Sequence, residues 1–174
     1  MKNPQIFLTP PDLGISFRLS KEYPMEYEFT TNNCLFDLIA SDRTTVLKSL
    51  VNCLQISGSI PDASPVLSAV LARESVKGTG LARGVACPHA RIPGITGIHV
   101  AVARLKNPVD FEASDGQPSK HIFLILTDKT SSPSTHIKTL SSIVKCYQSP
   151  EVLQKLTEAE DPKSYISLLQ ACHD

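Results

Sequence analysis

The stretch HIFLILT, residues 121–127, decides the fold, because every residue from Ile122 to Leu126 is apolar. A strand that is apolar on both faces usually lies inside a sheet covered by helices on each side. Ile98–Leu105 is a second stretch of strand length with small and apolar residues on both faces. Asp115-Gly116 lies between the two and predicts a tight turn. Together these features indicate a layered α/β domain.

The chain before these strands predicts two more strands and two helices. Cys34–Ile39 and Leu81–Cys87 are short apolar runs of strand type. Ser41-Asp42 predicts the cap of a helix, and Ser64-Pro65 predicts the start of another that ends near Ser75. The apolar positions of each helix follow the 3.6-residue period and predict its buried stripe: Val46, Leu47, Leu50, Val51 and Leu54 in the first, and Val66, Leu67, Val70 and Leu71 in the second.

Three helices are predicted after the last strand, because a capping residue followed by proline occurs at Ser132-Pro133, Ser149-Pro150 and Asp161-Pro162. The first should bury Ile137, Leu140, Ile143, Val144 and Tyr147; the second Val152, Leu153 and Leu156; the third Tyr165, Ile166, Leu168 and Leu169. The predicted fold is therefore a single α/β layered domain with a mixed sheet flanked by helices. Its order is strand, two helices, three strands, three helices.

The first thirty residues differ from the rest, with Pro4, Pro10, Pro11 and Pro24 and no clear period. We interpret residues 1–30 as an N-terminal extension with a short strand around Ile15–Leu19, and residues 31–174 as the domain.

Composition excludes several classes of protein. The 174 residues fit one domain, and 17 basic against 17 acidic residues give a net charge of zero, which argues against a general nucleic-acid binder. The sequence has no apolar run of membrane-spanning length and no signal-peptide pattern, so we expect no membrane insertion. The five cysteines are scattered without CxxC spacing. Reduced thiols and a cytoplasmic location are the simplest interpretation.

Among the five histidines, His89 is the strongest candidate for chemistry. It follows a strand pattern that ends at Pro88, and proline cannot donate to a sheet ladder. We therefore expect the strand to stop and His89 to lie at the rim of the sheet, where ligands of α/β folds bind. The residues that follow it, from Ala90 to Gly97, are expected to form a loop of small residues.

The residues around His89 resemble the phosphorylation-site signature of type-2 enzyme IIA domains of the phosphoenolpyruvate-dependent phosphotransferase system, in its fructose, mannitol and nitrogen-regulatory branches. The signature is carried by Glu74, by Leu81-Ala82 and by Val85–Ala90. Every position fits except Cys87, where the family usually has an aliphatic residue, and cysteine behaves as a small hydrophobe. The resemblance extends from about Thr31 to Ala171, and the fold of the family is similar to the predicted order.

The resemblance implies that His89 is the phosphoryl acceptor and that Arg73 and His136 are active-site residues, by their spacing from His89. A neutral imidazole is a competent nucleophile near pH 7. The planar guanidinium of Arg73 can hold two phosphate oxygens, and the start of the helix that carries His136 favours an anion. Thr135 is a possible further donor to the phosphate. We expect no cofactor and no metal, since phosphoryl transfer needs mostly positioning and charge stabilisation.

Other interpretations of these residues stay open at this point. His89 is otherwise a structural histidine, Arg73 a surface ion pair and His136 a helix-cap residue. Cys87 and His89 also suggest a thiol nucleophile with its base, although no third orienting residue is evident. A zinc site lacks a ligand cluster at usable spacing.

The resemblance implies a phosphocarrier, that is, a component of a phosphotransferase. It would take a phosphoryl group from an HPr-like protein onto His89 and pass it to an enzyme IIB domain for sugar transport, or keep it as a regulatory mark. The nitrogen-regulatory style is favoured. Leu81, Ile92 and Ile95, with Pro93, are expected to form an apolar rim for docking. The alternative is a binding module, or a degenerate family member, that controls partners such as kinases or channels without obligatory transfer.

Overall fold

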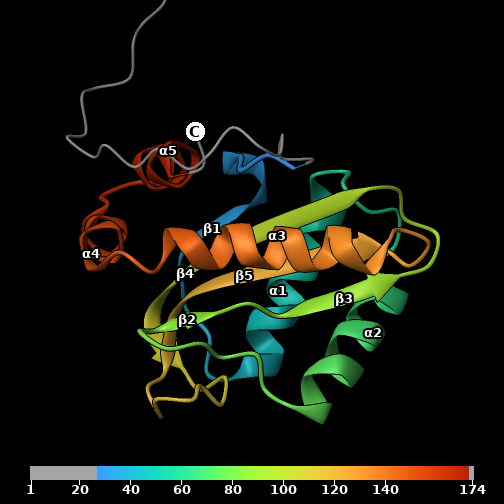
Figure 1. Ribbon diagram of the computed structural model, residues 1–174, viewed down its shortest axis with the longest axis horizontal. Helices are drawn as coiled ribbons and strands as arrows, with labels where there is room; N and C mark the ends of the chain where they lie inside the picture. The colour runs from blue at the N-terminus through green and yellow to red at the C-terminus, as the bar shows by residue number, and fades with distance from the viewer. Residues whose placement is uncertain (1–26, 173–174) are drawn as a thin grey trace, which may run out of the picture.

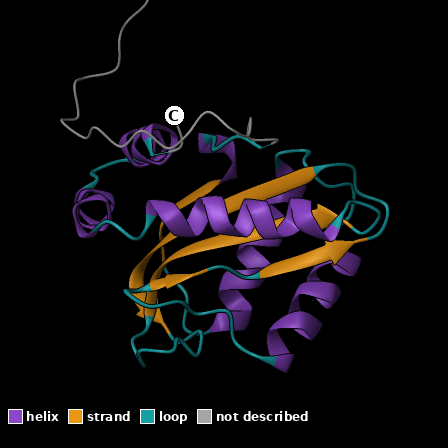
Figure 2. Ribbon diagram, viewed as in Figure 1, coloured by secondary structure: helices purple, strands orange, loops and turns teal. Residues whose placement is uncertain are grey.

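The computed structural model describes residues 27–172, which form one five-stranded sheet with helices on both faces (Figures 1 and 2). The strands are β1 (Cys34–Leu38), β2 (Val85–Ala86), β3 (His89–Ile92), β4 (Ile98–Val109) and β5 (Ser119–Asp128). The order across the sheet is β1-β4-β5-β2, and β3 also pairs with β5. The pair β4 and β5 is antiparallel and the other pairs are parallel, so the predicted mixed sheet is confirmed.

The helices begin where capping residues predict them, with one exception. They are α1 (Arg43–Ile56), α2 (Ala63–Val76), α3 (Pro133–Cys146), α4 (Pro150–Glu158) and α5 (Pro162–Ala171), and a short 3-10 turn, Thr31–Asn33, precedes β1. Asp42, Ser132, Ser149 and Asp161 each accept a backbone N–H at the helix start. In α2 the cap is Asp62, two residues before the predicted Ser64. No helix within residues 27–172 is both long and apolar enough to cross a bilayer.

Side-chain alternation along β5 divides the core into two layers. Ile122, Leu124 and Leu126 pack with α1 and α2, whereas Phe123 and Ile125 pack with α3, α4 and α5. Figure 1 shows α3 crossing the sheet on the face opposite α1 and α2. The stretch that is apolar on both faces is therefore covered on both sides, as predicted.

The predicted strand Leu81–Cys87 is shorter than expected, and an additional strand follows it. Arg83 and Gly84 have φ angles of 66° and 75°, so the backbone turns there and β2 contains only Val85 and Ala86. After Pro88 the chain pairs again with β5 as β3. The prediction of a loop directly after His89 is wrong, because Ala90, Arg91 and Ile92 are strand residues.

The folded body begins before Thr31. Tyr27 and Phe29 are 7% and 3% exposed and pack in the α3-side core, where the Phe29 ring meets Phe123 edge-on. The strand suggested around Ile15–Leu19 lies outside the described residues.

Candidate active site

His89 is the first residue of β3, directly after a break in the edge of the sheet. Pro88 has no N–H to donate, but its carbonyl accepts from Ile125 N at 2.9 Å, so the chain stays attached to β5 across the break. His89 pairs in register with Ile125 and Arg91 pairs with Thr127. Since Ala90 and Ile92 enter the α1/α2 core, alternation directs His89 and Arg91 to the face covered by α3.

One hydrogen bond fixes which nitrogen of His89 is free. The ring Nδ1 lies 2.9 Å from the backbone carbonyl oxygen of Cys87. A carbonyl only accepts, so Nδ1 carries the hydrogen and Nε2 of the neutral ring keeps its lone pair. Burial lowers the pKa of His89 below its ordinary value; the charge of Arg73 also lowers it, while the Cys87 carbonyl and Glu74 act in the opposite direction. At neutral pH the ring is therefore an uncharged base with a free Nε2.

His136 faces His89 from the first turns of α3. The two ring centroids are 5.1 Å apart and the rings are tilted by 58°. Nδ1 of His136 lies 2.9 Å from the hydroxyl oxygen of Thr127 near the end of β5. Burial is the main reason that the pKa of His136 falls to about 4, and the nearby groups His89, Arg91 and Arg73 lower it further. His136 is therefore also neutral at pH 7.

Two arginines supply positive charge to the histidine pair. Arg73, half-buried in the last turn of α2, donates from Nη1 to the Lys77 carbonyl at 3.1 Å. Its charge lowers the pKa of both histidines, so the fold brings the three predicted residues to one place. Arg91 was not assigned to the site from the sequence. Its Nη2 donates to the carbonyls of Lys129 (2.8 Å) and Ser131, and thereby ties down the segment between β5 and α3.

Glu74 of the signature and Thr135, the predicted further donor, have structural contacts. Glu74 is 6% exposed and accepts from Thr79 N at 3.0 Å and from the Thr79 hydroxyl at 2.7 Å, so it fixes the turn after α2. The hydroxyl of Thr135 lies 3.2 Å from that of Ser132 within the α3 cap. A role for Thr135 as a donor to phosphate stays a prediction.

The predicted apolar docking rim is wrong for two of its residues. Ile92 and Ile95 are 3% and 7% exposed and belong to the α1/α2 core. Ile92 is buried because it lies in β3, where alternate side chains enter that core, and Ile95 packs into the same core from the turn that follows β3. Leu81 is half-buried against the other core layer. Ile137, predicted to be buried, is 61% exposed and directly follows His136. It is the exposed apolar side chain that sequence reasoning missed beside the pair.

The structure contradicts a thiol nucleophile at Cys87. Its side chain is 3% exposed, and burial raises the pKa of the thiol to about 12, so the reactive thiolate does not form near pH 7. The contact with His89 is made by the Cys87 carbonyl and not by sulfur. Across residues 27–172, no three His, Cys, Asp or Glu side chains gather as metal ligands.

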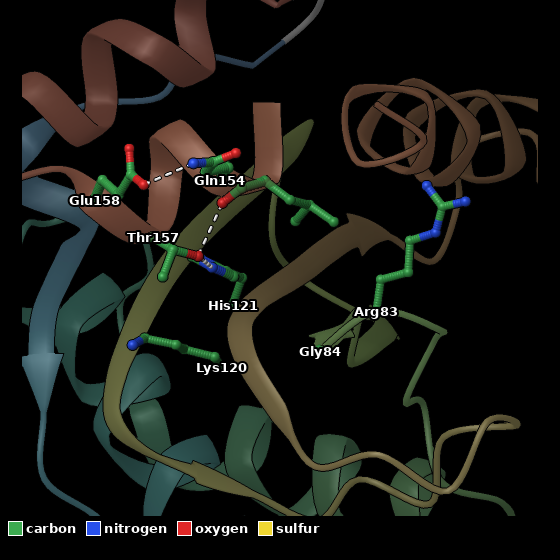
Figure 3. A pocket seen from close by; sticks show the side chains of 8 residues that line it. Arg83, Gly84, Lys120, His121, Gln154, Thr157 and Glu158 are labelled. Atoms are coloured by element: carbon green, nitrogen blue, oxygen red, sulfur yellow. Dashed lines mark hydrogen bonds between the residues drawn. The ribbon is translucent and has the colours of Figure 1, made fainter. Parts of the chain in front are cut away.

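A cleft lies away from the histidine pair (Figure 3). Arg83, Lys120 and Glu158 line it together with His121 and Thr157. His121 is 2% exposed, with Nδ1 at 2.9 Å from the Tyr165 hydroxyl and Nε2 at 3.1 Å from the Thr157 hydroxyl. Both nitrogens are occupied inside the fold, as expected of a structural histidine. The ring sits four residues before Ile125, about 13 Å along β5 from the level of His89.

Comparisons with known proteins agree with this geometry. Residues 28–172 match the family described as "Phosphoenolpyruvate-dependent sugar phosphotransferase system, EIIA 2". The chain is 29% identical over 145 residues to the fructose-specific EIIABC component of Bacillus subtilis, covering 83% of this chain but only 22% of that protein. It is 34% identical over 104 residues to a nitrogen regulatory protein of Bradyrhizobium diazoefficiens, covering 60% of this chain and 67% of the relative.

Solved structures show the same fold. Nitrogen regulatory protein IIA-Ntr from Neisseria meningitidis superposes with a TM-score of 0.74 at 24% identity, covering 80% of this chain and 94% of that one. IIA mannitol from Escherichia coli superposes with a TM-score of 0.70 at 16% identity, covering 82% and 99% of the two chains. With the family match across residues 28–172, the chain belongs to the type-2 enzyme IIA family of the phosphoenolpyruvate-dependent phosphotransferase system.

Proposed function

We propose that this protein is a cytoplasmic histidine phosphocarrier that accepts a phosphoryl group on Nε2 of His89. The observation that carries the proposal is the pair of neutral rings 5.1 Å apart, with Nδ1 of His89 held by the Cys87 carbonyl and Nε2 left as the nucleophile. A lone pair that is not protonated at pH 7 can attack phosphorus without first losing a proton.

The transfer step exchanges one phosphorus–nitrogen bond for another. The Nε2 lone pair of His89 forms a bond to phosphorus while the bond between phosphorus and the donor's imidazole breaks, and the electron pair of that bond returns to the donor ring. Nδ1 of His89 keeps its hydrogen, donated to the Cys87 carbonyl. The ring of phosphorylated His89, which keeps its hydrogen on Nδ1, is a good leaving group for the next transfer. Arg73 and His136 would bind the phosphoryl oxygens, and most of the catalysis is positioning and charge stabilisation.

The proposed donor is an HPr-like phosphocarrier protein, and exposed Ile137 beside His136 is a candidate contact for its docking. In the transport role the acceptor is an enzyme IIB domain. In the regulatory role there is no acceptor, and the phosphoryl group stays on His89 as a regulatory mark. The nitrogen-regulatory role is favoured because the relative at 34% identity carries that name. The family match and the fructose relative support the transport role.

The test uses the protein with phosphoenolpyruvate, enzyme I and an HPr-like carrier, followed by intact mass and peptide mapping under alkaline conditions that preserve phosphohistidine. We expect one phosphoryl group on His89 and its loss in His89→Ala. His99→Ala is the matched control, because His99 is a half-buried strand histidine whose Nε2 contacts the Thr96 carbonyl. An unlabelled wild-type protein with an intact fold, beside an active carrier, would end the proposal.

A regulatory binding module is the second candidate, and phosphoryl acceptance alone does not separate it from a transfer protein. Affinity capture of partners with the phosphorylated protein and with His89→Ala makes the distinction. A partner that binds only one state indicates regulation, whereas loss of the label to an added enzyme IIB indicates onward transfer.

A further inference from the structure

Thr127 contacts the active-site pair from inside the sheet. Its side chain is fully buried near the end of β5, between Arg91 on β3 and Ile98 on β4. Its hydroxyl oxygen lies 2.9 Å from Nδ1 of His136. The signature around His89 gives Thr127 no role, and the contact exists only because the end of β5 meets the first turns of α3.

The chemistry of the two ring contacts is different. At His89 the partner is a carbonyl, which only accepts and therefore places the hydrogen on Nδ1. At His136 the partner is a hydroxyl, which can donate to a bare Nδ1 as well as accept from a protonated one. A neutral imidazole has a single N–H. If Nδ1 accepts from Thr127, that N–H lies on Nε2, the nitrogen that Thr127 leaves available for a ligand.

We propose that Thr127 is a positioning residue that donates its hydroxyl hydrogen to Nδ1 of His136, so that Nε2–H of His136 is available to a phosphoryl oxygen on His89. The two facing histidines then hold opposite tautomers, one with a bare Nε2 that accepts phosphorus and one with an Nε2–H that donates to oxygen. The inference rests on the proposed phosphocarrier function. It adds the means by which a neutral second histidine acts as a donor.

The direct test is ¹⁵N NMR of histidine-labelled protein at pH 7.5, with the His136 signals assigned through His136→Gln. We expect the Nε2–H tautomer for His136 and the Nδ1–H tautomer for His89. An Nδ1–H tautomer at His136 would overturn the inference whether or not the protein accepts a phosphoryl group. A wild-type protein that shows the expected tautomers but takes no label would refute the proposed function instead.

The functional test compares Thr127→Val, which keeps the shape and removes the hydroxyl, with Thr127→Ser, which restores it. We expect Thr127→Val to accept phosphoryl groups about tenfold more slowly, the size of one net hydrogen bond, and Thr127→Ser to recover most of the rate. Thr139→Val is the matched control: Thr139 is a buried threonine on α3 whose hydroxyl donates to the Thr135 carbonyl.

Equal rates in wild type and folded Thr127→Val would contradict the positioning role, as would a loss of equal size in Thr139→Val. If Thr127→Val does not fold, the tautomer of wild-type His136 and the rate of Thr127→Ser still decide the question. A Thr127→Ser rate as low as that expected for valine would count against the role of the hydroxyl.

Discussion

Acidification should destabilise this fold through His121, well before most carboxylates titrate. The ring is 2% exposed, and burial is the main reason that its pKa falls from 6.5 to about 4, with Lys120 and Arg104 adding smaller effects. The unfolded chain binds this proton near pH 6.5, whereas the folded chain binds it only near pH 4. Between these values the unfolded state holds more protons, so the free energy of unfolding decreases as the pH falls.

The size of the effect follows from the two pKa values. For a shift from 6.5 to about 4, linkage gives a loss of about 2 kcal/mol between pH 7 and pH 5 from His121 alone. That is a considerable share of the roughly 5–15 kcal/mol by which single domains are stable. His136 also has a pKa of about 4, but its ring is only half-buried and solvent screening reduces its share.

Urea unfolding of wild type, His121→Gln and His136→Gln at pH 7, 6 and 5 measures the effect. The His121→Gln variant starts less stable at pH 7, because the hydroxyls of Tyr165 and Thr157 lose their ring partner. Its further loss between pH 7 and pH 5 should be about 2 kcal/mol smaller than that of wild type. The His136→Gln variant should show a smaller reduction. If wild type and His121→Gln lose equal stability over this interval, the buried neutral ring is not the cause.

Two further predictions concern the cations of the site. Arg73→Ala should slow phosphoryl acceptance about 10- to 100-fold, the range for a charge-assisted contact to phosphate. The urea midpoint should not change, because the side chain is half-buried at a helix end. A wild-type rate in this variant would contradict the assignment of Arg73 to the site. Arg91→Gln should raise the pKa of His136, since the arginine charge lowers it, and an NMR titration that shows no rise would exclude Arg91 as a source of the shift.

Local patterns predicted the frame of this fold well. The cap at Asp42 and the stripe Val46, Leu47, Leu50, Val51 and Leu54 in α1 are as expected, and all five side chains are buried. The strand apolar on both faces is the one that both helix layers cover. These features depend on neighbours in sequence, and that is why a single sequence reveals them.

The missed features depend on contacts between distant segments. Pro88 ends the ladder locally, but the chain resumes as β3 because β5 offers an unpaired edge, and nothing near Pro88 in sequence records that. In α3 the buried stripe contains Thr139 and Ile143, and His136 lies on the same side of the helix. Ile137 is one position further along, which turns its side chain by about 100° and places it toward solvent. Arg91 and Thr127 were missed as site residues because the register of β3 against β5 brings them there.

The placement of His89 on an edge strand explains how both helix layers can serve one imidazole. In a central strand, Arg73 on α2 and His136 on α3 would be separated by the thickness of the sheet. Within residues 27–172, β3 pairs only with β5 and no strand lies on its other side, and the charge of Arg73 acts on the same rings that α3 covers. An edge strand also tolerates Pro88, since proline loses only one donor there. The break at Pro88 thus serves the site, because it frees the Cys87 carbonyl to hold Nδ1 of His89 and leaves Nε2 as the nitrogen for the proposed phosphoryl transfer.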